Sequence, residues 1–283
     1  MKIIILCTTS ETYSIQRFQE EDSSVIIFNP YEHGGNEIEH FCTRFNPDEF
    51  IIFNRISGIR YDDRDLIFLE QIRERGFKVF GDLKQYRVFR CKWSQYQFYT
   101  AHNIPTIKTF NLEDLGKEGH RTNIKTEIHK LQSDSLFCKP KRSNQGKGIV
   151  EVKSLKGAVE SILDGRYVLQ PYIPKEREYR VLMLKNQALG VIEKRALDNE
   201  KILNAKSSKI SFLEYDQSFQ ELVAKIPSKI SELVNLPFYA IDLIVDPNQG
   251  PKVLEVNLCP GFEYFEKSSH INIAHLVMSS LKK

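Results

Sequence analysis

Several common signals are missing from this chain of 283 residues, and each absence excludes a class of protein. The five cysteines contain no C-x-x-C pair, and their odd number favours free thiols in a reducing compartment, for which the cytoplasm is the expected location. No signal-peptide cleavage region follows the first apolar run, IIILC after Lys2. That run is too short to span a membrane, so we predict a buried strand and no membrane partner.

The two best-known glycine-rich nucleotide motifs are also missing. No G-x-x-x-x-G-K-[ST] sequence occurs, which excludes a Walker A loop, and no G-x-G-x-x-G sequence occurs, which argues against a Rossmann-type dinucleotide site. There is no internal repeat and no low-complexity segment. A nucleotide site in this chain therefore has to be built from other residues.

The composition that remains is that of an ordinary globular protein. Hydrophobic residues make up 41% and charged residues 27% of the chain, which excludes wholesale disorder. The length favours two or three lobes. A net charge of +3 is only mildly basic, so it fits phosphate-containing or acidic substrates better than a nucleic-acid coat, and no nucleic-acid partner is expected.

Hydrophobic periodicity predicts a small parallel α/β lobe over residues 1–90, with strands at 2–7, 24–28, 49–53 and 77–80 and a helix at 62–76. The rest of the chain predicts an α+β region. The expected elements up to residue 173 are a helix containing KWSQYQFYT, a break at Asn103 to Pro105, two strands within 135–153, a helix at 154–165 and a strand at 166–173. After them we expect a hairpin at 178–196 and a helix at 218–236 that is interrupted at Pro227. The last elements expected are strands at 238–246 and 252–257 and a closing helix after His270.

Two of these strands carry polar side chains where a packed strand would keep apolar ones. If Val245 faces Lys252, then Asp242 falls opposite Glu255, with Asn257 further along the same face. Facing residues lie about 4.5–5.5 Å apart at Cα, so three oxygen donors converge. Such a set suits Mg²⁺, which retains waters and accepts substrate phosphates. The alternative is that both carboxylates pair with basic residues at a sheet edge.

A second polar segment is KPKRSNQGKGI, which begins at Lys139. Lys139 and Lys141 alternate onto one face of a strand, and the glycines Gly146 and Gly148 flank Lys147 in a loop. Backbone N–H groups and ammonium charge in such a loop can surround an anion. A solvated basic hairpin and a nucleic-acid patch remain alternatives for this segment.

The hairpin at 178–196 adds further charged residues. Glu178 and Arg180 share one face, where the carboxylate suits a ribose and the guanidinium suits phosphate oxygens. Glu193 and Arg195 share a face on the return strand, where Arg195 could hold a carboxylate or a transferring phosphoryl group; Lys194 is expected to point the other way into solvent. The alternative for the first pair is a surface salt bridge of little energetic value.

The order of these segments resembles the ATP-grasp superfamily, and within it the RimK-type and glutathione-synthetase-like carboxylate–amine ligases. The resemblance covers residues 92–267 and rests on the basic glycine loop, QPYI, EYRV, IEKRA, the ID of 241–242, and LEVN followed by PGFE. It implies an ATP-grasp fold of the mixed α/β (α+β) class. The lobes expected are residues 1–90, a central subdomain at 91–168, and a C-terminal subdomain at 169–283 that carries the metal site.

The resemblance also assigns roles, residue by residue, to matched positions. It implies ATP and Mg²⁺, or Mn²⁺ in its place, as cofactors. The implied nucleotide contacts are Lys92 and Lys139 at the phosphates, Gly146 and Gly148 in the loop, Gln170, Pro171, Tyr172 and Ile173 at adenine, Glu178 at ribose, and Asn204 near phosphate. The implied catalytic arginines are Arg180 and Arg195, and the implied metal ligands are Asp242, Glu255 and Asn257. Pro171 and the loose match around Asn204 depart from the family pattern.

The reaction implied by the resemblance is ATP-dependent formation of an amide bond through an acyl-phosphate. Its partners would be a carboxylate substrate and an amine substrate, namely an amino acid, a peptide or a protein tail. Three rivals share the fold: a maturase that cross-links a precursor peptide, a kinase that phosphorylates a hydroxyl, and a regulator that binds nucleotide without turnover. The complete set of predicted catalytic and metal residues favours an enzyme.

Overall fold

The computed structural model describes residues 1–116, 126, 135–144, 146–152, 165–174, 177–196, 208–213 and 223–282. Of the predicted helix at 154–165, all residues except Gly165 lie outside these residues, as does Asn204. Within the described part of the chain, no helix is long and apolar enough to cross a lipid bilayer.

The first lobe is the predicted parallel sheet. Its four strands run in the order β2-β1-β3-β4 and all pairs are parallel. The strands are β1 (Lys2–Leu6), β2 (Ile26–Phe28), β3 (Phe50–Asn54) and β4 (Lys78–Val79), and the helices are α1 (Tyr13–Glu21), α2 (Glu37–Arg44), α3 (Arg64–Glu74) and α4 (Leu83–Phe89).

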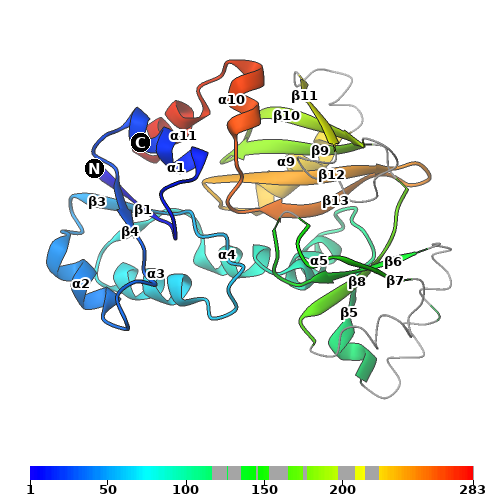
Figure 1. Cartoon of the computed structure of the whole chain (residues 1–283), viewed down its shortest axis with the longest axis horizontal. Coiled ribbons are helices and arrows are strands. Elements are labelled where there is room, and N and C mark those ends of the chain that lie inside the picture. Colours follow the sequence, from blue (N-terminus) through cyan, green and yellow to red (C-terminus); the bar gives the residue numbers. More distant parts are fainter. Residues whose placement is uncertain are drawn as a thin grey trace.

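Strand β1 is buried on both faces, which explains its continuous apolar sequence. Ile4 belongs to the cluster that contains the helix residues Phe41 and Phe68, whereas Ile3 packs in the cluster with Phe18 of α1. The last helix of the chain, α11 (Ile273–Lys282), packs beside α1 on the second face (Figure 1). Both chain ends therefore lie at the first lobe.

Helix α5 (Lys92–Ala101) leads from the first lobe into a second sheet. This sheet has the order β5-β8-β6-β7, and its neighbours are antiparallel. Its strands are β5 (Phe110–Asn111), β6 (Leu136–Pro140), β7 (Val150–Val152) and β8 (Tyr167–Pro171), with the 3₁₀ turn η1 (Leu112–Gly116) after β5. The two strands predicted around the glycine loop are confirmed as β6 and β7.

The third sheet is antiparallel and has the order β11-β10-β9-β12-β13. Its strands are β9 (Arg177–Leu184), β10 (Gln187–Ala196), β11 (Ser208–Leu213), β12 (Phe238–Asp246) and β13 (Gly250–Asn257). The predicted hairpin is confirmed as β9 and β10, with its turn at Lys185 and Asn186. Strand β11 was not predicted, because its polar sequence SKISFL gives no clear alternation.

Two helices differ from the sequence prediction. Helix α9 (Lys225–Leu233) contains Pro227 within its first turn, so the predicted interruption there is wrong. Residues 223 and 224, directly before α9, form a π-helical turn, so the backbone is already helical when it reaches Pro227. Helix α10 (Glu263–Ser269) follows the PGF sequence and was not predicted.

The structure is therefore of the mixed α/β class, with one parallel sheet and two antiparallel sheets. The domain limits at 90/91 and 168/169 stay a prediction. Strand β8, which crosses the second limit, pairs with β6 in the second sheet.

Gly58, in the loop after β3, has no room for a side chain. It adopts a φ of +70°, and a Cβ there would lie 2.3 Å from side-chain atoms of Arg90. We expect Gly58→Ala to lower the free energy of unfolding by about 2–4 kcal/mol, through backbone strain plus overpacking. Gly34→Ala, with a φ of +60° and no atom within 4 Å, should show the strain alone, about 1–2 kcal/mol. Equal losses in urea unfolding would contradict the clash.

Candidate active site

A cavity of about 950 Å³ lies where the three sheets meet. Strands β9, β10, β12 and β13 contribute one wall, and residues of β6 and β8 contribute another. The loops after β1 and β3 of the first lobe complete the lining, together with the segment after β13. Most of the predicted site residues line this cavity: Lys92, Lys139, Gly146, Gln170, Pro171, Tyr172, Ile173, Glu178, Arg180, Asp242, Glu255 and Asn257.

Strand register explains why the charged residues of the third sheet share one face. Arg180 of β9 pairs with Asp242 of β12, and Asp242 pairs with Glu255 of β13. On the other side of β9, Glu178 pairs with Lys194 of β10. Paired residues point to the same side of a sheet, so these five side chains converge on the cavity.

The facing of Asp242 and Glu255 depends on a β-bulge at Leu254. Lys252 pairs with Ile244 and not with Val245, so the predicted register near the turn is wrong by one residue. The register shifts between Asp242 and Leu243, which leaves Leu254 as the extra residue and restores the pairing of Asp242 with Glu255. The predicted carboxylate pair is therefore present, although the turn-proximal register is not the predicted one.

A second bulge decides which basic residue of β10 enters the cavity. The register of β9 with β10 shifts between Ala188 and Gly190, so later residues of β10 exchange faces. Lys194 consequently lines the cavity, and the expectation that it points into solvent is wrong. Arg195 pairs with Glu193 on the opposite face, is more than half exposed and does not belong to the cavity lining.

The carboxylates of the cavity are balanced by cations. Arg180 donates from Nε and Nη2 to the two oxygens of Asp242, at 2.7 Å each. Burial lowers the pKa of Arg180, but the Asp242 carboxylate outweighs this and keeps the pKa above its ordinary value. Lys92 Nζ lies 3.4 Å from Glu255 and donates to the hydroxyl and carbonyl oxygens of Ser143. Pairing of both carboxylates with basic residues is the alternative that the sequence left open, although the sequence did not identify Arg180 and Lys92 as the partners.

The donor set suits a divalent cation with hard oxygen ligands. Asp242, Glu255 and Asn257 offer two carboxylates and one carboxamide, the ligand types that Mg²⁺ takes alongside waters and phosphates. Each oxygen of Asp242 accepts one N–H from Arg180, and a carboxylate oxygen carries two lone pairs, so this contact does not saturate it. Among the described residues, no three His, Cys, Asp or Glu side chains form a metal cluster.

The segment predicted to hold adenine is fixed by β8. Gln170 is buried and donates from Nε2 to the hydroxyl oxygen of Thr109 at 2.8 Å, and the N–H of Tyr172 donates to Ser135 O. Thr109 and Ser135 directly precede strands β5 and β6, the neighbours of β8 in the second sheet. Their contacts hold the backbone of residues 170–173 along the cavity wall. Gly148 is not part of the lining; a Cβ at this residue would meet Pro140 at 2.9 Å.

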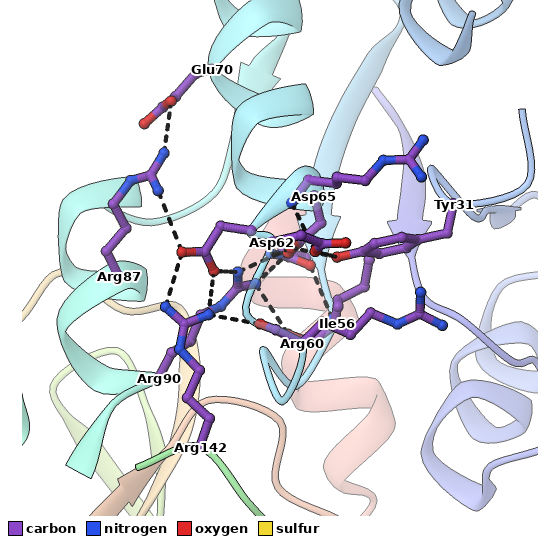
Figure 2. Close-up of polar contacts among 12 residues, drawn as sticks. Tyr31, Ile56, Arg60, Asp62, Asp65, Glu70, Arg87, Arg90 and Arg142 are labelled. Carbon is purple, nitrogen blue, oxygen red and sulfur yellow. Dashed lines mark hydrogen bonds and ion pairs between the residues drawn. The ribbon is translucent and has the colours of Figure 1, made fainter. Parts of the chain in front are cut away.

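A cluster of ion pairs fastens the glycine loop to the first lobe (Figure 2). Arg142 precedes that loop, and its guanidinium donates to both oxygens of Asp63 at 2.7 and 2.9 Å. Arg90 of the segment after α4 also donates to Asp63, at 3.0 Å, and to Asp65. The loop over the cavity is thus tied to the start of α3, a contact that no sequence pattern indicated.

Asp63 is a good place to test this fastening, because its φ of 48° is one that asparagine tolerates. We expect Asp63→Asn to lower the free energy of unfolding by about 2–4 kcal/mol at pH 7, because the guanidinium groups of Arg87, Arg90 and Arg142 all lose a carboxylate. Asp62→Asn, at an exposed neighbour, should change it by less than about 0.5 kcal/mol. An equally small loss for both variants would contradict the fastening.

The same carboxylate predicts a pH dependence. Burial raises the pKa of Asp63, but hydrogen bonds from Arg142 outweigh this, so the pKa lies below its ordinary value of 3.8. A lowered pKa in the folded state gives stability that is present above the ordinary pKa and is lost as the pH falls below it. Urea unfolding at pH 7 and pH 3 should therefore show a smaller difference between Asp63→Asn and the unaltered chain at the lower pH.

Comparisons with known proteins agree with this architecture. A family model described as the RimK-like ATP-grasp domain matches residues 91–281. A probable alpha-L-glutamate ligase of Haemophilus ducreyi is 23% identical over 99% of this chain and 98% of its own length. The glutamate–LysW ligase ArgX of Sulfurisphaera tokodaii is 31% identical over 49% of this chain and 48% of its own.

Among solved structures, the D-alanine–D-alanine ligase from Bacillus anthracis complexed with ATP superposes with a TM-score of 0.73. The match covers 99% of this chain and 95% of that one at 16% identity, so it shows the shared fold alone. Because the family match spans more than half of the chain, the protein belongs to the RimK-like ATP-grasp family. It is accordingly an ATP-dependent carboxylate–amine ligase.

Proposed function

We propose that this ligase joins the amino group of an amino acid to a carboxylate of a peptide or protein tail, through an acyl-phosphate. L-glutamate is the first candidate for the amino acid, because the relatives that match along their whole length are named probable alpha-L-glutamate ligases. The observation that carries the proposal is the single charged sheet face of Glu178, Arg180, Lys194, Asp242 and Glu255, which lines the same cavity as the basic segment of Lys139 and Gly146.

The residues on the nucleotide side divide by chemistry. Lys92 and Lys139 would supply ammonium groups for the phosphates, and residues 170–173, which line the cavity, would contact adenine through backbone groups that the second sheet leaves unpaired. Glu178 would accept hydrogen bonds from ribose hydroxyls; Lys194 Nζ lies 3.8 Å from its carboxylate. Lys92 begins helix α5, and Lys139 belongs to strand β6 of the second sheet. The two lysines would therefore hold the triphosphate between this helix and the second sheet.

Asp242, Glu255 and Asn257 would hold Mg²⁺, or Mn²⁺ in its place. When bound, such an ion neutralises charge on the triphosphate and polarises the phosphoryl oxygens. Arg180 orients Asp242 through two hydrogen bonds, which fixes the carboxylate toward Glu255. In this proposal Arg180 orients the metal ligand Asp242, and its contact with the transferred phosphoryl group stays a prediction. Arg195 lies outside the cavity lining, so the proposal gives it no catalytic role.

The reaction has two steps. A carboxylate oxygen of the first substrate attacks the γ-phosphorus of ATP, the bond to the β-phosphate oxygen breaks, and ADP is formed with an acyl-phosphate. The amine then attacks the acyl carbon, phosphate departs, and the amine proton passes to the phosphate or to water. Lys139 and Lys194 offset the negative charge of the transferred group.

All five cysteines are free, in keeping with work in a reducing compartment, and we propose the cytoplasm. Burial raises the pKa of Cys7 to about 11 and raises that of Cys259 as well. Both thiols are therefore protonated at neutral pH, and neither is assigned a nucleophilic role.

An ADP-release assay with pooled carboxylates, with and without L-glutamate and other amino acids, tests the proposal. Release that requires both a carboxylate and an amine is the expected result. Release with hydroxyl compounds alone would replace the ligase with a kinase. Release that needs the carboxylate and no added amine would favour a peptide cross-linker, in which both groups belong to one substrate.

A further inference from the structure

Arg55, the residue after β3, is a buried cation for which the described residues provide almost no partner. Its side chain is 8% exposed, and Nη2 donates to the carbonyl oxygen of Pro260 at 2.8 Å. Nε and Nη1 are buried without a hydrogen-bond acceptor in the described part of the chain. Burial lowers the pKa of Arg55, and the groups that oppose this are only the thiols of Cys259 and Cys7 and the phenol of Tyr86.

A second buried arginine in the same region shows what a structural role looks like. Arg90 has a fully buried side chain, and its guanidinium contacts the carboxylates of Asp63 and Asp65. The buried guanidinium of Arg90 is thus compensated by two carboxylates from the fold itself. Around Arg55 it supplies aromatic rings, with Phe18, Phe53 and Phe238 at 5.4–5.9 Å from the guanidinium carbon. An uncompensated buried charge is costly, which indicates that the missing anion comes from outside.

The position of Arg55 in the fold is that of a ligand-binding residue. In a parallel sheet with the order β2-β1-β3-β4, successive strands are added on opposite sides of β1, so a topological switch point lies between β1 and β3. Ligands bind beyond the carboxyl ends of the strands at such a point. Cys7 and Arg55 are the first residues after these two strands, and both line the large cavity. The backbone of Arg55 is fixed there, because its N–H donates to Leu6 O at 2.8 Å.

The start of α1 adds a second feature that suits an anion. Thr12, Tyr13 and Ser14 line the same cavity as Arg55. No side chain caps this nine-residue helix, and its first turn contains no acidic residue. The start of this helix and the Arg55 guanidinium both border the cavity, and the guanidinium carbon lies 5.9 Å from the ring of Phe18 in the same helix. The partial positive charge of the helix start and the guanidinium can therefore act on one anion.

We propose that Arg55 and the first turn of α1 bind a carboxylate group of a substrate, and that this carboxylate is not the one that is phosphorylated in the reaction. This inference rests on the proposed function, and it deepens it by naming the substrate class: one reactant carries a spare carboxylate, as an acidic amino acid or a dicarboxylic acid does. The reacting carboxylate has to meet the phosphates at Lys139 and Glu255, which belong to the other two lobes. Arg55 comes from the first lobe, so the group that it holds is the distal, unreacted one.

The experiment observes the Arg55 guanidinium directly. The protein is labelled with ¹⁵N-arginine, and the Nε–H signal of Arg55 is assigned by its loss in Arg55→Met. It is then titrated with sodium L-glutamate and sodium glutarate up to about 50 mM, at which a complex with a Kd of about 5 mM is nine-tenths saturated. Glutaramide, which has the same length and no charge, is the matched ligand control.

We expect a saturable shift of the Arg55 signal with either carboxylate and none with the diamide. Affinity should fall about tenfold to hundredfold in Arg55→Met, because a charge-assisted hydrogen bond is lost, whereas Arg60→Met should bind as the unaltered chain does. Arg60 belongs to the same loop, and its exposed side chain lies outside the cavity lining. ATP binding by Arg55→Met, measured by calorimetry, shows that this variant is folded.

No saturable shift with either carboxylate overturns the inference, as does a shift that the diamide reproduces. The result is separate from that of the ADP-release assay. If a carboxylate binds at Arg55 but the protein never releases ADP, the proposed reaction is wrong and the anion site stands. Amine-dependent release of ADP in a protein whose Arg55 signal stays fixed would mean the reverse.

Discussion

The Glu255→Gln variant is expected to release ADP at least about 100-fold more slowly than the unaltered chain. Glutamine keeps the size of the side chain and removes the charge that faces Asp242 across β12 and β13. Affinity for ATP should remain within about tenfold, because in the proposed function Lys139 and residues 170–173, which line the same cavity, would hold the nucleotide independently of Glu255. Stopped turnover with retained ATP binding, by calorimetry, would place the defect at the metal ligands.

Asp246→Asn is the matched control for that variant. Asp246 lies on the same strand as Asp242, pairs with Lys252 at 2.8 Å and is outside the cavity lining. Loss of its charge should lower stability and leave the ADP-release rate per folded molecule within about twofold. Equal losses of turnover in both variants would mean that Glu255 acts through the stability of the β12–β13 pair, and the metal assignment would then fall.

The sequence predicts the first lobe well because its pattern depends on local rules. Strands such as β1 and β3 are short, continuous apolar runs, and a parallel sheet covered on both faces requires that composition. The long helix α3 ends where Gly76 follows it. Such signals lie within a few residues of the element that they define, so a single chain is enough to read them.

The candidate site is only partly predictable because the face of a strand depends on register. Alternation along one strand correctly groups Glu178 with Arg180, and Glu193 with Arg195. Alternation alone does not say whether Lys194 or the pair of Glu193 and Arg195 lies on the same sheet face as Glu178, since a single extra residue in β10 exchanges the two faces. Gly190, an isolated glycine within the strand, was the one local signal of that extra residue. The bulge at Leu254 has no comparable signal. The pairing of Asp242 with Glu255 was predicted correctly because the extra residue Leu254 cancels the one-residue register error near the turn.

Contacts between lobes are not encoded in any local pattern. The pairing of Asp63 with Arg142 joins residues 79 positions apart, and Arg55 meets Pro260 across 205 positions. In the sequence each of these arginines is one basic residue among many. Their burial and their partners arise only after the lobes have packed, which is why the fastening of the glycine loop and the anion site of the first lobe were both missed.

The bulge in β10 leads to the second large effect, a contrast between two adjacent basic residues. We expect Lys194→Met to lower ADP release by about 10- to 100-fold, because an ammonium group that faces Glu178 across the cavity wall is lost. Arg195→Met should change it by less than about twofold, because that guanidinium is half exposed and pairs with Glu193 outside the cavity. Initial rates at saturating ATP measure both variants.

A readout independent of turnover follows from the same geometry. Chemical acetylation followed by mass spectrometry should show Lys194 protected when ATP is bound, because its side chain lines the cavity. Lys209, exposed on β11 and paired in register with Arg195, should be acetylated equally with and without ATP. If Arg195→Met has the larger effect and ATP leaves Lys194 reactive, the hairpin lacks the bulge in solution, and the charged face would contain Glu193 and Arg195 in place of Lys194.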